Sequence, residues 1–329
     1  MKKTHILILT LVLLLTSSCH HSGSKEADIT DIEIEQVQIK RYGMDLFNVD
    51  PENVSAGLEE LSGEYRFFLG DNYNDTLSII QISEYINDPF LREIAGYTNK
   101  TYPDLEATEE ELTLAFRYYL YHFPGGHVPS IFSYISGVDF DHPVQYLDTV
   151  MIIALDTYLG KDNIPYQKMR IPAYRTRRMQ EAFIPFDCMR EVVRVKHLDP
   201  YPGERLIDQM IYHGKILYFL DNVFPGRPDT LKIGFASDQL DWCYANESNL
   251  WAFLVENELL YSTDFQKINK LINEGPFTSF FEKESPARTG VWLGWQIVRA
   301  YMERNDTGLK EMITQKDAVE ILTRSSYKP

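Results

Sequence analysis

Three polar side chains interrupt the most apolar helical stretch of the sequence, residues 204–221. Asp208, Tyr212 and Lys215 are spaced by four and then three residues, so they share one face of a helix. A carboxylate and an ammonium on a mostly buried helix need partners, because burying either charge alone costs on the order of several kcal/mol. We expect the row to line a polar cleft in which Lys215 neutralises Asp208. The alternative is a helix end whose polar row faces water.

The rest of this stretch is apolar around most of the helix circumference. At helical spacing, one apolar row consists of Leu206, Met210 and Leu217, and a second of Ile207, Ile211 and Tyr218. The apolar surface is widened further by Ile216, Phe219 and Leu220. A helix that is apolar on most sides belongs inside a core. Residues 204–221 are therefore predicted to form a central buried helix.

Two further charged residues lie where folded elements present functional groups. Asp156 directly follows the continuously apolar run 150–155, which is typical of a central strand. Asp156 could act at the end of the sheet, or it could cap the following turn by accepting hydrogen bonds from local N–H groups. Arg299 lies in the apolar helical segment 291–301. We expect it to reach Asp156 or Asp208, or else to face solvent.

The sequence contains few signs of catalysis. His-Glu-x-x-His, Gly-x-Ser-x-Gly, the phosphate-binding loop and Gly-x-Gly-x-x-Gly are all missing. His122 and His127 flank a turn that could bring them together, but two nitrogen ligands make a weak zinc site. We assign no catalytic residue, no cofactor and no metal ligand.

The N-terminus predicts export and lipid anchoring. Lys2 and Lys3 precede a short apolar run, which ends in small residues before Cys19. This pattern is typical of a lipoprotein signal peptide over residues 1–18, cleaved so that Cys19 becomes the acylated first residue. An ordinary secretory signal with an incidental cysteine is the alternative. The acyl chains on Cys19 would bind the lipid bilayer at about 0.8 kcal/mol per buried CH₂. Residues 19–31 are small and polar, as in a flexible tether.

The charge of the chain without its signal peptide indicates which classes of partner it can bind. The net charge is −16, and removing Lys2 and Lys3 with the signal makes it −18. This excess argues against nucleic acid and against an anionic membrane face. With 44% hydrophobic residues, the chain can bury a large core, and we predict one domain over residues 32–329. Cys188 and Cys243 are predicted to be buried thiols, with a disulfide as the alternative.

Local patterns predict a mainly helical α+β protein with a small sheet packed on the central helix. Alternating or continuous apolar residues predict strands over 32–39, 130–136 and 150–155. Capping signals and apolar periodicity predict helices over 51–68, 108–121, 186–196 and 237–258, from 264 onward, and over 291–301.

Three segments together carry a resemblance to a known family. They are residues 204–221, the run Leu155-Asp156-Thr157-Tyr158-Leu159-Gly160, and residues 291–301. All three resemble the GldB-type gliding-motility lipoproteins of Bacteroidetes. That family in turn resembles predicted zincin-like metalloproteases, which carry His-Glu-x-x-His on the corresponding helix. Here those positions read Asp208-Gln209-Met210-Ile211-Tyr212, without either histidine and with Gln for Glu. The resemblance implies a degenerate zincin-like domain, a peptidase fold without peptidase chemistry.

The resemblance also implies a function. It indicates an envelope lipoprotein that works as a non-catalytic scaffold or binding component. No acidic run follows Cys19 as a surface-export signal, so we expect the protein to be anchored in the outer membrane and to face the periplasm. Its expected partner is an envelope protein of the gliding and protein-secretion machinery. The alternative is a periplasmic, peptidase-like hydrolase with an unrecognised site, and metal content would discriminate between the two.

Overall fold

The computed structural model describes residues 27–329, and the predicted central helix lies in its core. Helix α10 (Leu206–Val223) is buried over most of its length. It packs against α9 (Ile184–Lys196), α6 (Glu106–His122) and α15 (Thr289–Arg304). The prediction for residues 204–221 is therefore confirmed.

The α10–α15 crossing is the tightest helix contact of the core. A Cβ on Gly294 would lie 1.9 Å from Met210 O, and one on Gly214 would lie 2.3 Å from Gly294 O. The two backbones touch here because neither glycine carries a side chain. Trp292 and Trp295 flank the crossing and are fully buried. Both are core residues, as expected for aromatic residues on an apolar helix.

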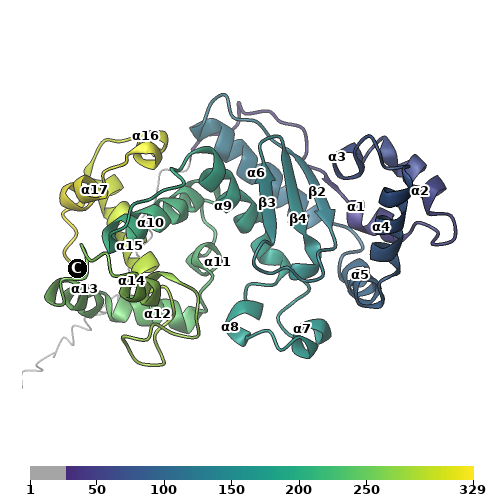
Figure 1. The fold of residues 1–329 in the computed structure, drawn as a ribbon. Coiled ribbons are helices and arrows are strands. Elements are labelled where there is room, and N and C mark those ends of the chain that lie inside the picture. The colour runs from purple at the N-terminus through teal and green to yellow at the C-terminus, as the bar shows by residue number, and fades with distance from the viewer. Residues whose placement is uncertain (1–26) are drawn as a thin grey trace, which may run out of the picture.

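A small mixed sheet forms the middle of the molecule (Figure 1). Its strands are β1 (Ile39–Lys40), β2 (Ser130–Tyr134), β3 (Val144–Leu147) and β4 (Val150–Ala154), in the order β1-β2-β4-β3. β1, β2 and β4 are parallel, and β3 pairs antiparallel with β4 at the edge. The predicted strands over 130–136 and 150–155 are confirmed. The sheet packs mainly on α9, which in turn packs on α10, so the expected direct packing of the sheet on the central helix is wrong.

The predicted strand over residues 32–39 is wrong except at its end. Val37 N donates to Thr113 Oγ1 and Ile39 N donates to Glu109 Oε1, so side chains of α6 satisfy this backbone. The segment remains extended but joins the sheet only at Ile39 and Lys40. β-Branched residues favour an extended chain, but they do not determine what the chain pairs with.

Five short helices form one end of the molecule. They are α1 (Tyr42–Phe47), α2 (Val54–Ser62), α3 (Arg66–Leu69), α4 (Thr76–Asn87) and α5 (Pro89–Thr101). The predicted helix over 51–68 is wrong as one element: it begins only at Val54, because Asp50 Oδ1 accepts a hydrogen bond from Glu52 N and holds a turn there, and it is interrupted between Ser62 and Arg66. Likewise α6 begins at Glu106, before the expected cap Thr108, whose hydroxyl donates to Glu181 instead.

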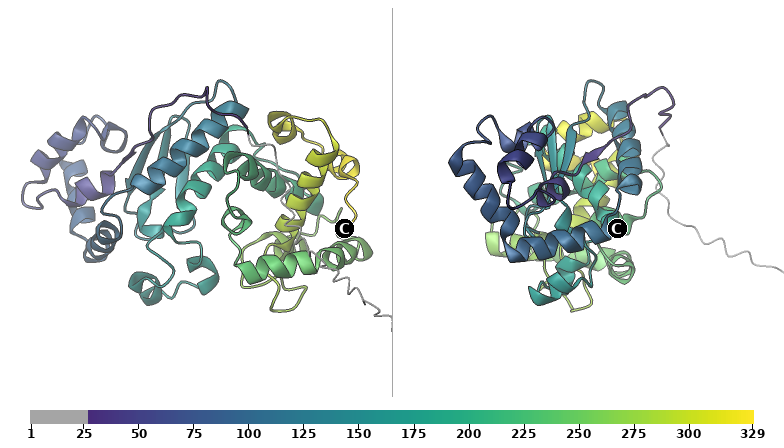
Figure 2. Two further views of the ribbon diagram at one scale, coloured as in Figure 1. Left: turned by 180° about the vertical axis from the view of Figure 1, so that it is seen from behind. Right: turned by 90° about the vertical axis from the view of Figure 1, so that its right-hand side faces the viewer.

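The other end of the molecule is helical and contains the C-terminus. In the chain, β4 is followed by η1 (Leu155–Thr157), α7 (Ile164–Lys168), α8 (Ala173–Thr176) and η2 (Glu181–Phe183), and α7 and α8 lie below the sheet in Figure 1. The end itself adds α11 (Asp229–Ile233), α12 (Ser237–Ala245), α13 (Glu247–Glu256), α14 (Phe265–Ile272), α16 (Leu309–Thr314) and α17 (Ala318–Ser325). Figures 1 and 2 show the sheet between the two helical ends.

Two of these helices replace one predicted helix. The helix expected over 237–258 is interrupted at Asn246, whose side chain donates to Trp242 O. An Asn that bonds the preceding turn ends a helix readily. Leu250 and Leu254 are buried, as predicted, and Asp264 caps α14 by accepting from the N–H groups of Gln266 and Lys267.

These elements confirm the predicted class, a predominantly helical α+β fold with a small sheet. Across residues 27–329, none of the helices combines the length and the hydropathy needed to cross a membrane.

Candidate functional site

The first predicted site residue, Asp208, is neutralised locally. Its carboxylate lies 2.8 and 2.7 Å from Nε and Nη2 of Arg205, and Oδ2 also accepts from Arg205 N at 3.0 Å. Asp208 thereby caps the N-terminus of α10, where the helix dipole favours a negative charge. The expected pairing of Asp208 with Lys215 is wrong, because Arg205 precedes Asp208 by less than one helical turn and reaches it first.

Lys215 caps the C-terminus of a different helix, α16. Its buried ammonium donates to Ile313 O at 3.2 Å and to Gln315 O, at the C-terminus of α16. A cation is favourable at this end of a helix dipole. Burial lowers the pKa of Lys215 to about 8.

Asp208, Tyr212 and Lys215 nevertheless share a cleft, as their spacing predicted. All three line a groove of about 390 Å³ together with Asp199 and Tyr201. The row on α10 therefore faces a cleft, but its two charges are held by capping contacts and not by each other.

Asp156 does not line this groove and is completely buried after β4. Its Oδ1 accepts from Ser136 N at 2.9 Å and its Oδ2 accepts from Val138 N at 2.6 Å. Asp156 thus fixes the connection between β2 and β3. Of the two interpretations from sequence, backbone capping describes it better, but the donors precede Asp156 in the chain and do not belong to the following turn.

Arg299 joins a buried ionic network and does not reach Asp156 or Asp208. Its guanidinium makes two bonds of 2.8 and 2.9 Å to Asp221, and two of 2.9 and 3.0 Å to Asp229. Lys232 also contacts both carboxylates, at 2.8 and 3.3 Å, and Trp295 Nε1 donates to Asp221. The predicted pairing is wrong because Arg299 lies beyond the Gly294 crossing, next to the C-terminal end of α10. Two carboxylates and two cations balance, which is typical of a structural network.

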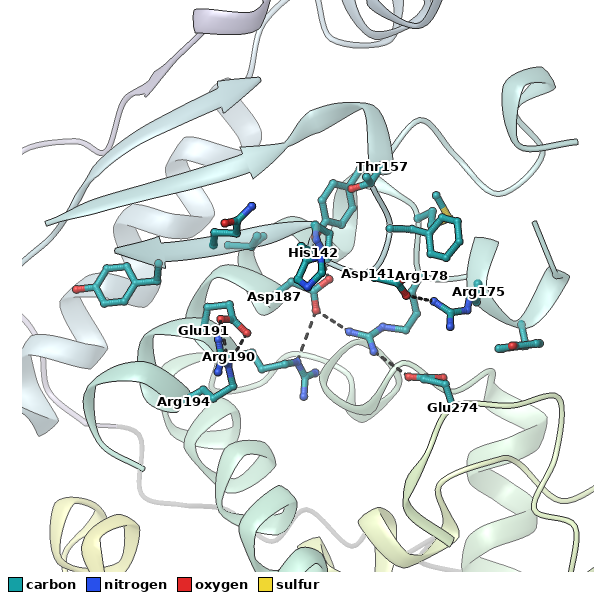
Figure 3. Close-up of a pocket in the computed structure, with 18 of the residues that line it drawn as sticks. Asp141, His142, Thr157, Arg175, Arg178, Asp187, Arg190, Glu191, Arg194 and Glu274 are labelled. Atoms are coloured by element: carbon teal, nitrogen blue, oxygen red, sulfur yellow. Dashed lines mark hydrogen bonds and ion pairs between the residues drawn. The ribbon is translucent and has the colours of Figure 1, made fainter. Parts of the chain in front are cut away.

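A pocket of about 770 Å³ lies elsewhere, between β3 and α9 (Figure 3). One wall is a charged stripe on α9, where Asp187, Arg190, Glu191 and Arg194 share a helix face at spacings of three, four and seven. The opposite face of α9 is apolar and buried, so packing of that face turns the stripe into the pocket.

Two carboxylates organise the inner end of this pocket. Asp187 accepts from Arg178 Nη2 at 2.6 Å and from the Tyr158 hydroxyl at 3.1 Å. Glu274 lies 3.4 Å from Arg178 Nη1 and 3.2 Å from Arg288 Nε. At the other end Arg194 forms a separate bidentate pair with Glu191, so its charge is balanced.

The inner end contains one more positive charge than negative charges. Arg178 and Arg190 line the pocket with the two carboxylates, and a third guanidinium, that of Arg288, contacts Glu274 without lining the pocket itself. Arg190 Nη2 donates to Lys232 O at 2.8 Å, whereas its Nε is 3.6 Å from Asp187 Oδ1. Burial, with the nearby positive charge of Arg178, lowers the pKa of Arg190 to about 10. Such a centre is chemically suited to bind an anion.

Unmet hydrogen-bond donors mark the same centre. The Nε atoms of Arg178 and Arg190 are buried, and neither donates a hydrogen bond within residues 27–329. Arg288 Nε also makes none, although it lies 3.2 Å from a carboxylate oxygen of Glu274. Buried donors without acceptors are costly, so their concentration in one place is a functional signal. The sequence analysis missed this pocket entirely. The clustered basic residues 175–178 were the available signal.

The remaining candidates have simple environments. Cys188 and Cys243 are both buried free thiols, as predicted. His127 Nε2 is bonded to Asp148 O at 2.9 Å, and burial lowers the pKa of His122. In the part of the chain that the structure describes, no three His, Cys, Asp or Glu side chains are arranged to hold a metal ion. Cys19 lies outside the described residues.

Comparison with known proteins gives one match. The model of a family described as gliding motility protein GldB matches residues 22–329. No curated protein and no solved structure matches the chain.

Proposed function

The chain belongs to the family of the gliding motility protein GldB, and from this premise we propose that it is a lipid-anchored binding component of the gliding machinery and not a peptidase. Family membership identifies a gliding-motility-associated lipoprotein of the cell envelope. The proposal adds that Cys19 is the acylated anchor, that the domain faces the periplasm from the outer membrane, and that the protein acts by holding an envelope partner.

One observation carries the proposal: the arginine-rich pocket between β3 and α9. Its volume of about 770 Å³ is that of a ligand site. Its inner end concentrates positive charge in a chain whose net charge is −16. Local charge opposite in sign to the rest of the molecule favours a specific anionic ligand, since the surrounding surface repels anions in general.

The environment of the α10 row supports a binding role over peptidase chemistry. At the positions where the resemblance places metal ligands, Asp208 caps α10 through Arg205 and Tyr212 carries a phenol. Nearby, Lys215 holds the end of α16. Contacts of this kind stabilise the fold and leave these groups little freedom to activate water.

The proposal is tested by gene replacement in the source bacterium, with colony spreading on agar as the readout. We expect deletion to abolish spreading and the unaltered gene to restore it. Arg190→Gln should restore little spreading although the protein is present in membranes at the normal level. Spreading of the deletion strain at the parental rate would contradict the proposal. One zinc ion per purified chain, together with chelator-sensitive peptide hydrolysis, would support the hydrolase instead.

A further inference from the structure

The edge of β3 that faces away from β4 lines the same pocket, although the side chains of Val144 and Tyr146 are themselves buried. Ala154 N donates to Pro143 O at 2.8 Å, and Val144 is opposite Ile153 in the antiparallel register. Bonded and non-bonded pairs alternate along such a ladder. Gln145 and Leu147 therefore direct their N–H and C=O groups towards β4, whereas Val144 and Tyr146 direct theirs away from it.

These outward groups have no partner in residues 27–329. Within residues 27–329, the backbone N–H and C=O groups of Val144 and Tyr146 make no hydrogen bond to backbone or to side chains. All of β3 lines the pocket, and the strand is four residues long. At about 3.4 Å per residue, it offers an edge of about 14 Å to which an extended chain can add.

The charged stripe of α9 runs along this edge in the same direction as β3. At the end of β3, Lys196 is paired with Asp148 and lies over the Tyr146 ring. At its beginning, Asp187 is bonded to Tyr158, which follows the end of β4. Figure 3 shows Arg178 and Glu274 towards one end of the pocket, Glu191 and Arg194 towards the other, and Arg190 between them, below Asp187. The excess positive charge therefore lies near the first residues of β3.

We propose that this pocket binds the C-terminal segment of an extended peptide, which adds antiparallel to β3 and places its terminal carboxylate at Arg190 and Arg178. Addition of a strand to a sheet edge and capture of a terminal carboxylate are both known modes of peptide recognition. The antiparallel direction follows from the charge, since only a chain running opposite to β3 ends near the first residues of that strand.

The charge count favours a carboxylate over a phosphate group. Three guanidinium groups face two carboxylates at the inner end, so a single negative charge completes the balance. A phosphate dianion would leave an excess of one negative charge. The planar fork of an arginine also matches the two oxygens of a carboxylate. The inference rests on the proposed function, because it names the chemistry of the ligand that the binding component holds.

The first test uses the purified chain and a random hexapeptide library displayed with free C-termini. Selected peptides are synthesised with a free carboxylate, with a C-terminal amide, and with single N-methyl groups along the chain. Binding is measured by fluorescence polarisation. We expect amidation to weaken binding about tenfold or more, and N-methylation to weaken it at alternate positions only, because alternate N–H groups face β3.

The second test compares matched variants of the protein. Arg190→Gln should weaken binding of the carboxylate peptide about tenfold, and Arg190→Lys should recover only part of it, because an ammonium lacks the fork. Arg194→Gln lies on the same helix face but is paired with Glu191, so it should change affinity less than about threefold. Thermal unfolding of each variant identifies any loss caused by misfolding.

Three results would overturn the proposal: a library that yields no binder, equal binding of acid and amide, or equal loss at every N-methyl position. Stronger competition by inorganic phosphate than by acetate would instead assign the centre to phosphate. A failure here leaves the spreading assay untouched, so failure of this inference and failure of the proposed function can be distinguished.

Discussion

Two aspartates of α10, Asp221 and Asp208, differ in how far their cationic partners are exposed to solvent. Asp221 lies between Arg299 and Lys232, whose side chains are 11% and 7% exposed. Asp208 is paired with Arg205, which is 40% exposed and can be solvated by water. At the residue scale, therefore, the cost of losing a charge depends on whether its partner can reach solvent.

We expect Asp221→Asn to lower the free energy of unfolding by about 3–5 kcal/mol, because it leaves two buried cations with only Asp229. Asp208→Asn should cost about 1 kcal/mol, from a weakened helix cap and a part-exposed ion pair. Denaturant unfolding of the two variants measures both. Similar losses for the two would show that Asp208 is as strongly coupled to the core as Asp221.

His213, also on α10, should make stability depend on pH. Burial lowers its pKa to about 4, and the charges of Arg288 and Arg190 act in the same direction. Since the unfolded value is near 6.5, this contribution is complete above about pH 6.5 and is lost as the pH falls towards 4. From pH 7 to pH 5, the free energy of unfolding should therefore fall by about 1–2 kcal/mol less in His213→Gln than in the parent.

Urea unfolding at pH 7, 6 and 5 measures this difference. His197, whose pKa burial also lowers to about 4, contributes equally to both proteins. If the His213→Gln curve is parallel to that of the parent, His213 is protonated normally in the folded protein.

At the scale of elements, the α10–α15 crossing should tolerate no added atom. Gly294→Ala would place a Cβ 1.9 Å from Met210 O, and backbone cannot move aside as a side chain can. We expect a loss of about 3 kcal/mol or more.

Gly96, inside α5, is the matched control because a Cβ there meets nothing within 4 Å. Gly96→Ala should gain about 0.5–1 kcal/mol from helix propensity alone. Thermal and denaturant unfolding of the pair separate the two effects. An unchanged stability in Gly294→Ala would mean that the two helices can separate without cost.

At the scale of the whole molecule, membrane attachment should depend on Cys19 alone. We expect Cys19→Ala to move the protein from the membrane pellet to the soluble periplasmic fraction, because removal of the acyl chains removes the anchoring energy of their buried CH₂ groups. Arg190→Gln should remain in the pellet, since it alters the pocket and not the anchor. Recovery of Cys19→Ala in the pellet would point to a protein contact as the anchor.

The sequence by itself determined the features that are local or that repeat along the chain. The core helices 204–221 and 291–301, the strands 130–136 and 150–155, and the buried state of both tryptophans follow from apolar periodicity. Periodicity is a property of neighbouring residues, so it survives without knowledge of the fold. Family membership is likewise a property of the sequence, since the family model matches residues 22–329.

The tertiary structure alone decided which charges meet and which edge is free. Arg299 pairs with Asp221 and not with Asp208 because the glycine crossing sets how α15 lies on α10. The pocket brings Glu274 to Arg178, residues far apart in the chain. β3 presents unpaired groups only because the strand order β1-β2-β4-β3 places it at the edge. Electrostatic pairing and edge exposure depend on distances in space, and a linear pattern does not contain those distances.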